Sequence, residues 1–137
     1  MSTQKTNSES DLAKADRLLS AIAALEQQVE QIRGTGEIAP PACHVARYQV
    51  KRPHQSYWYY KLHASDPIFK RANRSRKLSK YKHLGKGGSA AHVEAVMQVT
   101  RRILIDELQQ AIYTLQQVLV DLGNNSDSEG KSSASPK

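Results

Sequence analysis

The sequence has little cysteine, few Phe and Trp residues, and no long apolar run. Its 137 residues include one cysteine, one tryptophan and one phenylalanine. A single cysteine, Cys43, excludes an internal disulfide, and no signal-peptide-like apolar segment begins the chain, so we expect a reducing intracellular setting. No stretch approaches the ~18 apolar residues of a membrane-spanning helix, so no span is expected. Peripheral binding to an anionic membrane is disfavoured because neither predicted helix places Lys or Arg beside a strongly apolar, exposed aromatic face. The shortage of Phe and Trp excludes a large aromatic core and leaves helices as the main source of stability.

Acidic residues are scarce in the middle of the chain. Between His44 and Arg102 there are 14 Lys and Arg residues but only two acidic ones, a net charge of +12. The remaining residues have a net charge of −5, so the whole chain has a net charge of +7. Self-repulsion makes this segregation costly, and the usual reason for it is a polyanionic partner. The alternative is that the basic residues only keep a small sheet soluble and protect its edges. The charge ratio favours the polyanion, and nucleic acid in particular.

No recognisable motif for catalysis or metal binding is present. The histidines and Cys43 are metal-ligand types, but no paired CxxC or HxxxH spacing connects them. The basic region offers no pair of carboxylates, and no Ser, His and Asp arrangement has a nucleophile context. The segment "GKGGS", residues 85–89, lacks the spacing of a nucleotide-hydrolysing P-loop. This segment is either a flexible turn or a binding site for one backbone phosphate, formed with Lys86 and the amides at the start of the following helix. We therefore expect no enzyme and no cofactor.

Two segments carry apolar residues at helical spacing. The first, 11–33, has a capping-box-like start at Ser8 and Asp11 and a stop at Gly34. The second, 90–122, begins at the N-cap Ser89. Both patterns predict heptad-like helices that pair, either antiparallel within one chain or across chains as a homodimer. The two stripes are Leu18, Ile22, Leu25, Val29 and Ile32, and Ile105, Leu108, Ile112, Leu115, Leu119 and Leu122.

Residues 45–85 change to the period-two alternation of strands. We predict strands at 45–52, 56–63 and 77–84. In the second strand Trp58, Tyr60 and Leu62 share one face, on which Trp58 and Tyr60 are expected to be core residues. The other face is expected to hold Tyr57, Tyr59, Lys61 and His63. The connection 64–76 is too long for a tight hairpin and is expected to be an exposed basic arm.

These elements predict one α+β domain in which two long heptad-patterned helices flank a small three-stranded antiparallel sheet. Both termini are polar and of low complexity and are expected to be disordered. The predicted order is a tail at 1–10, a domain at 11–122 and a tail at 123–137. Within the domain it is helix 11–33, linker 34–44, basic sheet 45–85 and helix 90–122.

Short motifs in the basic region resemble known modules. "YWYYKL" at 57–62 is followed by "RKLSKYKHLGK" at 76–86 and by a helix containing "RR". This order resembles the small basic sheet-plus-helix DNA-binding modules of prokaryotic mobile elements, such as the arm-type or AP2-like N-terminal domains of integrases. It also resembles uncharacterised prokaryotic proteins with a YxYL strand and a YLGK-like strand end. The resemblance covers about residues 56–102 and implies DNA contact through the sheet, with matching positions at Tyr59, Lys61, Lys80 and Lys82. The chain differs in having no recombinase catalytic domain and an added N-terminal helix, so we do not carry over a recombination role.

Charge, strand pattern and resemblance together predict a non-catalytic nucleic-acid-binding protein of the prokaryotic cytoplasm or nucleoid, with DNA favoured over RNA. Phosphate contacts are expected from the basic sheet and the 64–76 arm. The alternative is an oligomeric coiled-coil adaptor whose basic patch docks an acidic protein. The candidate contact residues are Arg52, Tyr57, Tyr59, Lys61, Lys70, Arg71, Arg74, Arg76, Lys77, Lys80, Lys82 and Lys86.

Overall fold

The computed structural model describes residues 9–71 and 76–131, with side chains up to residue 125. The predicted α+β class is confirmed, because the described elements are two helices, a three-stranded antiparallel sheet and a short two-stranded one. The chain divides into two compact units. We call residues 32–105 the sheet unit and the remaining residues the helical unit. That the two units fold as a single domain stays a prediction.

The helical unit contains helix α2 (Asp11–Arg33) up to Gln31 and the part of helix α3 (Ala90–Lys131) that begins at residue 106. The start of α2 is capped by Ser10, whose Oγ accepts a hydrogen bond from the Ala13 amide at 3.1 Å. Ser8 was the predicted cap, but an N-cap hydroxyl reaches amides only from the position directly before the first turn. The Glu9 carboxylate also accepts hydrogen bonds from Arg17. The predicted disordered tail therefore does not extend to residues 9 and 10, and 1–8 lie outside the described residues.

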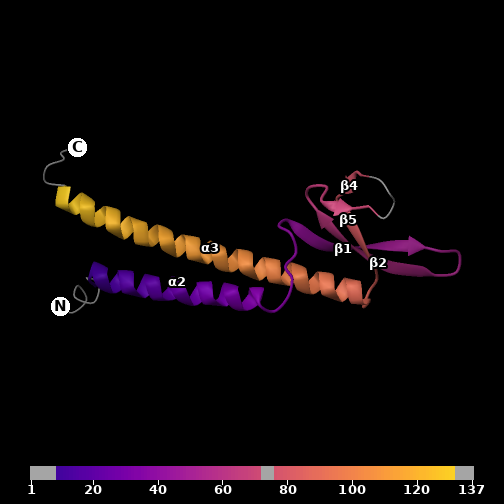
Figure 1. Cartoon of the computed structure of the whole chain (residues 1–137), viewed down its shortest axis with the longest axis horizontal. Coiled ribbons are helices and arrows are strands. Elements are labelled where there is room, and N and C mark those ends of the chain that lie inside the picture. Colours follow the sequence, from indigo (N-terminus) through magenta and orange to yellow (C-terminus); the bar gives the residue numbers. More distant parts are fainter. Residues whose placement is uncertain (1–8, 72–75, 132–137) are drawn as a thin grey trace. The chain divides into compact units, whose positions relative to one another are not determined.

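The predicted apolar stripes are the less exposed sides of the two helices. Ile22 and Val29 are buried in α2 and Ile112 in α3, and the other stripe residues of this unit are half-buried. The two helices run antiparallel in this unit (Figure 1). A fully buried aliphatic side chain contributes about 1.5 to 3 kcal/mol, so these residues hold the pair together. A homodimer through the same helices stays a prediction.

Helix α3 continues to Lys131, beyond the predicted end at Leu122. The helix therefore extends past the predicted boundary between the domain and the C-terminal tail, and residues 132–137 lie outside the described part of the chain. Gly123 is a poor helix former, but one glycine in a helix costs only about 1 kcal/mol. Extending an existing helix also avoids the cost of nucleation, so polar residues can continue it.

The three-stranded sheet has the order β1-β2-β5 and lies in the sheet unit. Strand β1 (Cys43–Lys51) and strand β2 (Ser56–Ala64) form a long antiparallel hairpin in which Tyr48 is opposite Tyr59. Strand β5 (Tyr81–Lys86) pairs with the other edge of β2. The first two strands lie within two residues of their predicted bounds.

The third predicted strand, 77–84, is two strands in the structure. Strand β4 (Leu78–Ser79) pairs with β3 (Phe69–Lys70), and β5 begins only at Tyr81. The break is at Lys80, whose carbonyl accepts a hydrogen bond from the Ala64 amide while Ser79 Oγ accepts one from the Tyr81 amide. The segment 64–76 is thus not a simple exposed arm, because part of it is a strand in a second hairpin.

The core of the sheet unit lies between the sheet and the first part of α3. Leu62 and Leu84 from the sheet and Ala95 and Val99 from α3 are all buried, together with Ala39, Cys43 and Ala64. Small side chains on the helix let it approach the strands closely. Figure 1 shows this stretch of α3, in light orange, beside the sheet.

Trp58 was predicted to be a core residue, and this is wrong, because its side chain is 45% exposed. It does lie on the same face of β2 as Leu62 and Tyr60. However, α3 begins at Ala90, and the Tyr60 ring already contacts His92 in the first turn, with 4.0 Å between centroids. The hairpin extends past the start of the helix, so α3 does not bury Trp58, and Arg47 Cζ lies 4.1 Å from its ring centroid.

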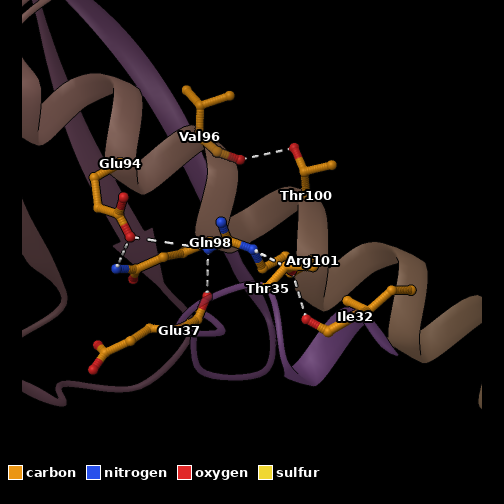
Figure 2. Close-up of polar contacts among 8 residues, drawn as sticks. All are labelled: Ile32, Thr35, Glu37, Glu94, Val96, Gln98, Thr100 and Arg101. Carbon is orange, nitrogen blue, oxygen red and sulfur yellow. Dashed lines mark hydrogen bonds and ion pairs between the residues drawn. The ribbon is translucent and has the colours of Figure 1, made fainter. Parts of the chain in front are cut away.

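Two of the 14 basic residues between His44 and Arg102 attach the linker 34–44 to α3, namely Arg101 and Arg102. Arg101 Nε donates to Thr35 Oγ1 at 3.1 Å, and its Nη1 donates to the Glu37 carbonyl at 2.9 Å (Figure 2). Arg102 Nε donates to the carbonyl of Ala39, whose amide in turn donates to the Gln98 carbonyl. Positive charge in this region is therefore partly structural.

Replacing Arg101 by methionine is expected to lower the free energy of unfolding by about 1.5 to 3 kcal/mol, because hydrogen bonds from a charged group to Thr35 and Glu37 are lost. Methionine keeps most of the apolar stem. Urea unfolding followed by circular dichroism measures the change, with Arg71→Met, an exposed residue beyond β3, as the control. Equal stability of the two variants would contradict the anchoring role.

Candidate nucleic-acid interface

The sheet has one face that is turned away from its core, which we call the open face. Side chains alternate between the faces of a strand, and the strand register places these residues in rows. The side chains of this face are His44, Ala46, Tyr48 and Val50 from β1, Tyr57, Tyr59, Lys61 and His63 from β2, and Tyr81, His83 and Lys86 from β5. None of these side chains is buried, and none is acidic.

Aromatic rings on the open face contact one another across the strands. His63 lies between His44 and Tyr81, with 4.9 and 4.8 Å between ring centroids, and its plane is only 16° from that of Tyr81. Tyr48 and Tyr59 form a second stacked pair, 6.0 Å apart. Such cross-strand pairs stabilise a sheet and fix ring orientation. The result is an ordered aromatic surface rather than a set of independent side chains.

Two lysines lie over these rings. Lys61 Nζ is 4.3 Å from the centroid of Tyr81 and 5.3 Å from that of Tyr48. Lys86 Nζ is 4.1 Å from the centroid of Tyr57. Cation–π attraction holds an ammonium group near a ring face without neutralising its charge. The open face therefore combines flat apolar rings with net positive charge.

A glycine places Lys86 on this face. Simple alternation along β5 would put Leu84 and Lys86 on the same side, yet Leu84 is buried and Lys86 is opposite Tyr59. The register shifts by one residue here, and Gly85 has a φ of +88°. A residue inserted in this way forms a β-bulge, and glycine takes up the left-handed conformation with little strain. The bulge lets one strand supply both a core leucine and an open-face lysine.

The predicted contact residues do not all lie on one surface. Tyr57, Tyr59, Lys61 and Lys86 share the open face. Lys82 is opposite Leu62 and lies on the helix side, where it lines a shallow cavity with Glu94 and Gln98. The structure therefore does not extend the open face to Lys80 and Lys82.

The remaining predicted contacts surround the sheet at its ends. Arg52 is exposed at the tip of the β1–β2 hairpin. Lys70 lies in β3, and Arg71, Arg76 and Lys77 are exposed in the connection to β4. Arg74 lies outside the described residues. These side chains lie on loops and strand ends, not along a single strand.

The "GKGGS" segment is an ordered turn into α3. Ser89 is the N-cap, as predicted, because its Oγ accepts from the His92 amide at 3.1 Å and donates to the Leu84 carbonyl at 2.8 Å. The Gly88 amide donates to His92 Nδ1 at 2.9 Å. Ser89 thus already satisfies one of the helix amides predicted to hold a phosphate. The structure supports the turn interpretation, with Gly88 at a φ of +86°.

Several open-face residues were missing from the predicted contacts, namely Tyr48, Tyr81, His44, His63 and His83. Tyr48 donates or accepts a hydrogen bond with His83 Nδ1 at 3.1 Å. The sequence contained a signal for Tyr48, because a turn at residues 52–55 places it opposite Tyr59 in an antiparallel hairpin. Tyr81 and His83 alternate along the chain with the predicted contacts Lys80 and Lys82.

The described residues offer little reactive chemistry. Burial raises the pKa of the Cys43 thiol, although the nearby Arg102 charge opposes this, so the thiol is mainly protonated at neutral pH. Within residues 9–71 and 76–131, no three His, Cys, Asp or Glu side chains are grouped so that they could hold a metal ion. No helix in the described chain has the length and apolar character needed to cross a membrane.

Comparisons of this chain with protein-family models, with curated proteins and with solved structures find no match.

Proposed function

We propose that this chain is a non-catalytic nucleic-acid-binding protein that acts through the open face of its sheet. The observation that carries the proposal is the combination of Lys61 and Lys86 with aromatic rings on a face that has no acidic side chain. Phosphate contacts supply most of the affinity of such proteins, and rings add contacts with bases or sugars. The resemblance to DNA-binding modules favours DNA, in the prokaryotic cytoplasm or nucleoid.

Basic residues at the ends of the sheet are suited to extend the binding surface. Lys70, Arg71 and Arg76 are exposed beside β3 and β4, and Arg52 is exposed at the hairpin tip. Neither Asp66 nor Glu94, the two acidic residues of the basic region, is on the open face, and Glu94 accepts a hydrogen bond from Gln98. A polyanion approaching this face therefore meets mostly uncompensated positive charge.

The test compares lysines on the two faces of the same sheet. Replacing Lys61 and Lys86 by glutamine is expected to weaken nucleic-acid binding for any sequence. It should also reduce the slope of log affinity against log salt by about 0.7 to 0.9 for each lost phosphate contact. The matched control is Lys51→Gln with Lys82→Gln, which removes the same charge from the helix side. Fluorescence anisotropy at several salt concentrations measures both.

An unchanged slope in the Lys61 and Lys86 variant would rule out the open face as the phosphate-binding surface. Equal changes in the two double variants would mean that only net charge matters, which also contradicts the proposal.

A second candidate function is an oligomeric adaptor that docks an acidic protein. The observation that favours it is an exposed apolar stripe on the first part of α3, where Val93, Met97 and Leu104 are 51, 46 and 47% exposed. Nucleic-acid binding does not explain this stripe. If the chain is such an adaptor, an acidic partner protein should bind its basic residues. Excess oligonucleotide should then not displace that partner.

A further inference from the structure

We propose that the open face is a stacking platform for unpaired bases, so that the chain binds single-stranded nucleic acid in preference to duplex. This inference rests on the proposed function and names the ligand class of the same surface. Two groups of rings carry it. The first is the row formed by His63 and Tyr81, and the second is the pair formed by Tyr48 and Tyr59.

The rings of the open face are partly exposed to solvent. Tyr81 is 41% exposed, and the aromatic side chains of Tyr59 and His63 are only half-buried by their neighbours. Cross-strand contacts hold the rings in place before a ligand binds, which reduces the entropy lost on binding. Every base has a π-face, so such a platform accepts any sequence.

Lys61 lies between the two ring groups. It is two residues from Tyr59 and two from His63 on β2, so the groups are separated by roughly 13 Å along the strand. Its ammonium already lies near the rings of Tyr81 and Tyr48. Two bases bound on the two ring groups would therefore not be adjacent in the strand, and the phosphates between them would lie close to a cation.

Duplexes cannot use this platform. A paired base has both faces covered by its neighbours in the helix, so its π-surface is not available to a tyrosine. Duplex binding would depend on the lysines and arginines alone. The aromatic rings should therefore contribute to single-strand affinity and not to duplex affinity.

The test measures the affinity of oligo-dT, oligo-U and a DNA duplex, each of about 12 nucleotides or base pairs, within the range of known single-strand site sizes. The variant is Tyr59→Leu with Tyr81→Leu. We expect each leucine to reduce affinity for the single strands by roughly 5- to 150-fold and to leave duplex affinity unchanged. Comparing the affinities for oligo-dT and oligo-U shows whether the unpaired bases come from single-stranded DNA, from single-stranded RNA or from both.

Two control variants isolate the effect of the ring. Tyr59→Phe with Tyr81→Phe keeps the rings and should keep single-strand affinity. Trp58→Leu removes an exposed ring from the same strand but from the opposite face, and should have no effect. Circular dichroism confirms that the variants are folded, and Tyr81→Leu alone, at an exposed position, provides a milder substitution.

Equal losses for single strand and duplex in the leucine variant, or no loss at all, would overturn the inference. A loss in Trp58→Leu as large as that in the tyrosine variant would also overturn it. If the Lys61 and Lys86 variant weakens binding while the tyrosine variants do not, the stacking platform is wrong and the proposed function stands. If neither affects binding, both are wrong.

Discussion

Replacing Leu62 by alanine is expected to lower the free energy of unfolding of the sheet unit by about 2 to 5 kcal/mol. Leu62 is only 4% exposed and belongs to the core cluster that joins β2 and β5 to α3. Truncation removes apolar contacts and leaves a cavity that its neighbours, including Ala64 and Ala95, are too small to fill. Chemical denaturation followed by circular dichroism measures the loss.

Leu78→Ala is the matched control for this substitution. Leu78 lies in β4 and is 45% exposed, so the same change there should cost less than about 0.5 kcal/mol. The Leu62 variant should also bind nucleic acid more weakly as it approaches unfolding, because Lys61 and His63 depend on the position of β2. Similar stabilities for the two alanine variants would show that the core has been wrongly located.

Replacing Ile112 by aspartate is expected to unfold the helix pair, with a loss of more than about 3 kcal/mol, together with loss of helicity and solubility. Ile112 is 9% exposed in α3 and belongs to its predicted apolar stripe. An aspartate there either keeps its charge without a partner in an apolar interface or must be protonated. Both outcomes are costly.

The neighbouring residue provides the control. Tyr113 is 55% exposed, so Tyr113→Asp introduces the same charge one position along the same helix but on its solvent side. It should leave the far-ultraviolet circular dichroism and the melting temperature nearly unchanged. If Ile112→Asp behaves in the same way as Tyr113→Asp, the helix pair is not stabilised by this stripe.

Periodicity in the sequence predicted the elements well, because each regular structure imposes its own spacing on buried residues. Ile22 and Val29 follow the helical spacing and are buried. The two faces of β2 also separate as predicted, with Leu62 in the core and Lys61 outside. These are local properties, which a single segment can reveal.

The errors concern how the elements fit together. Alternation gives the face of Trp58, but it cannot show that α3 begins too late to cover it. A charged run does not show that the chain changes pairing partner at Lys80, since this depends on hydrogen bonds with distant residues such as Ala64. The aromatic contacts across the open face were missed for the same reason, because each of them joins residues from different strands.

The bulge at Gly85 also limits which residues this part of the chain can hold. A β-branched residue at position 85 would disfavour the left-handed conformation and the bulge, and with regular alternation Lys86 would lie on the same side as Leu84, away from Tyr57. The hairpin tip at 52–55 is different, because its residues are exposed and lie outside the paired strands. Substitutions should therefore accumulate at the tip among related sequences, while position 85 should stay glycine.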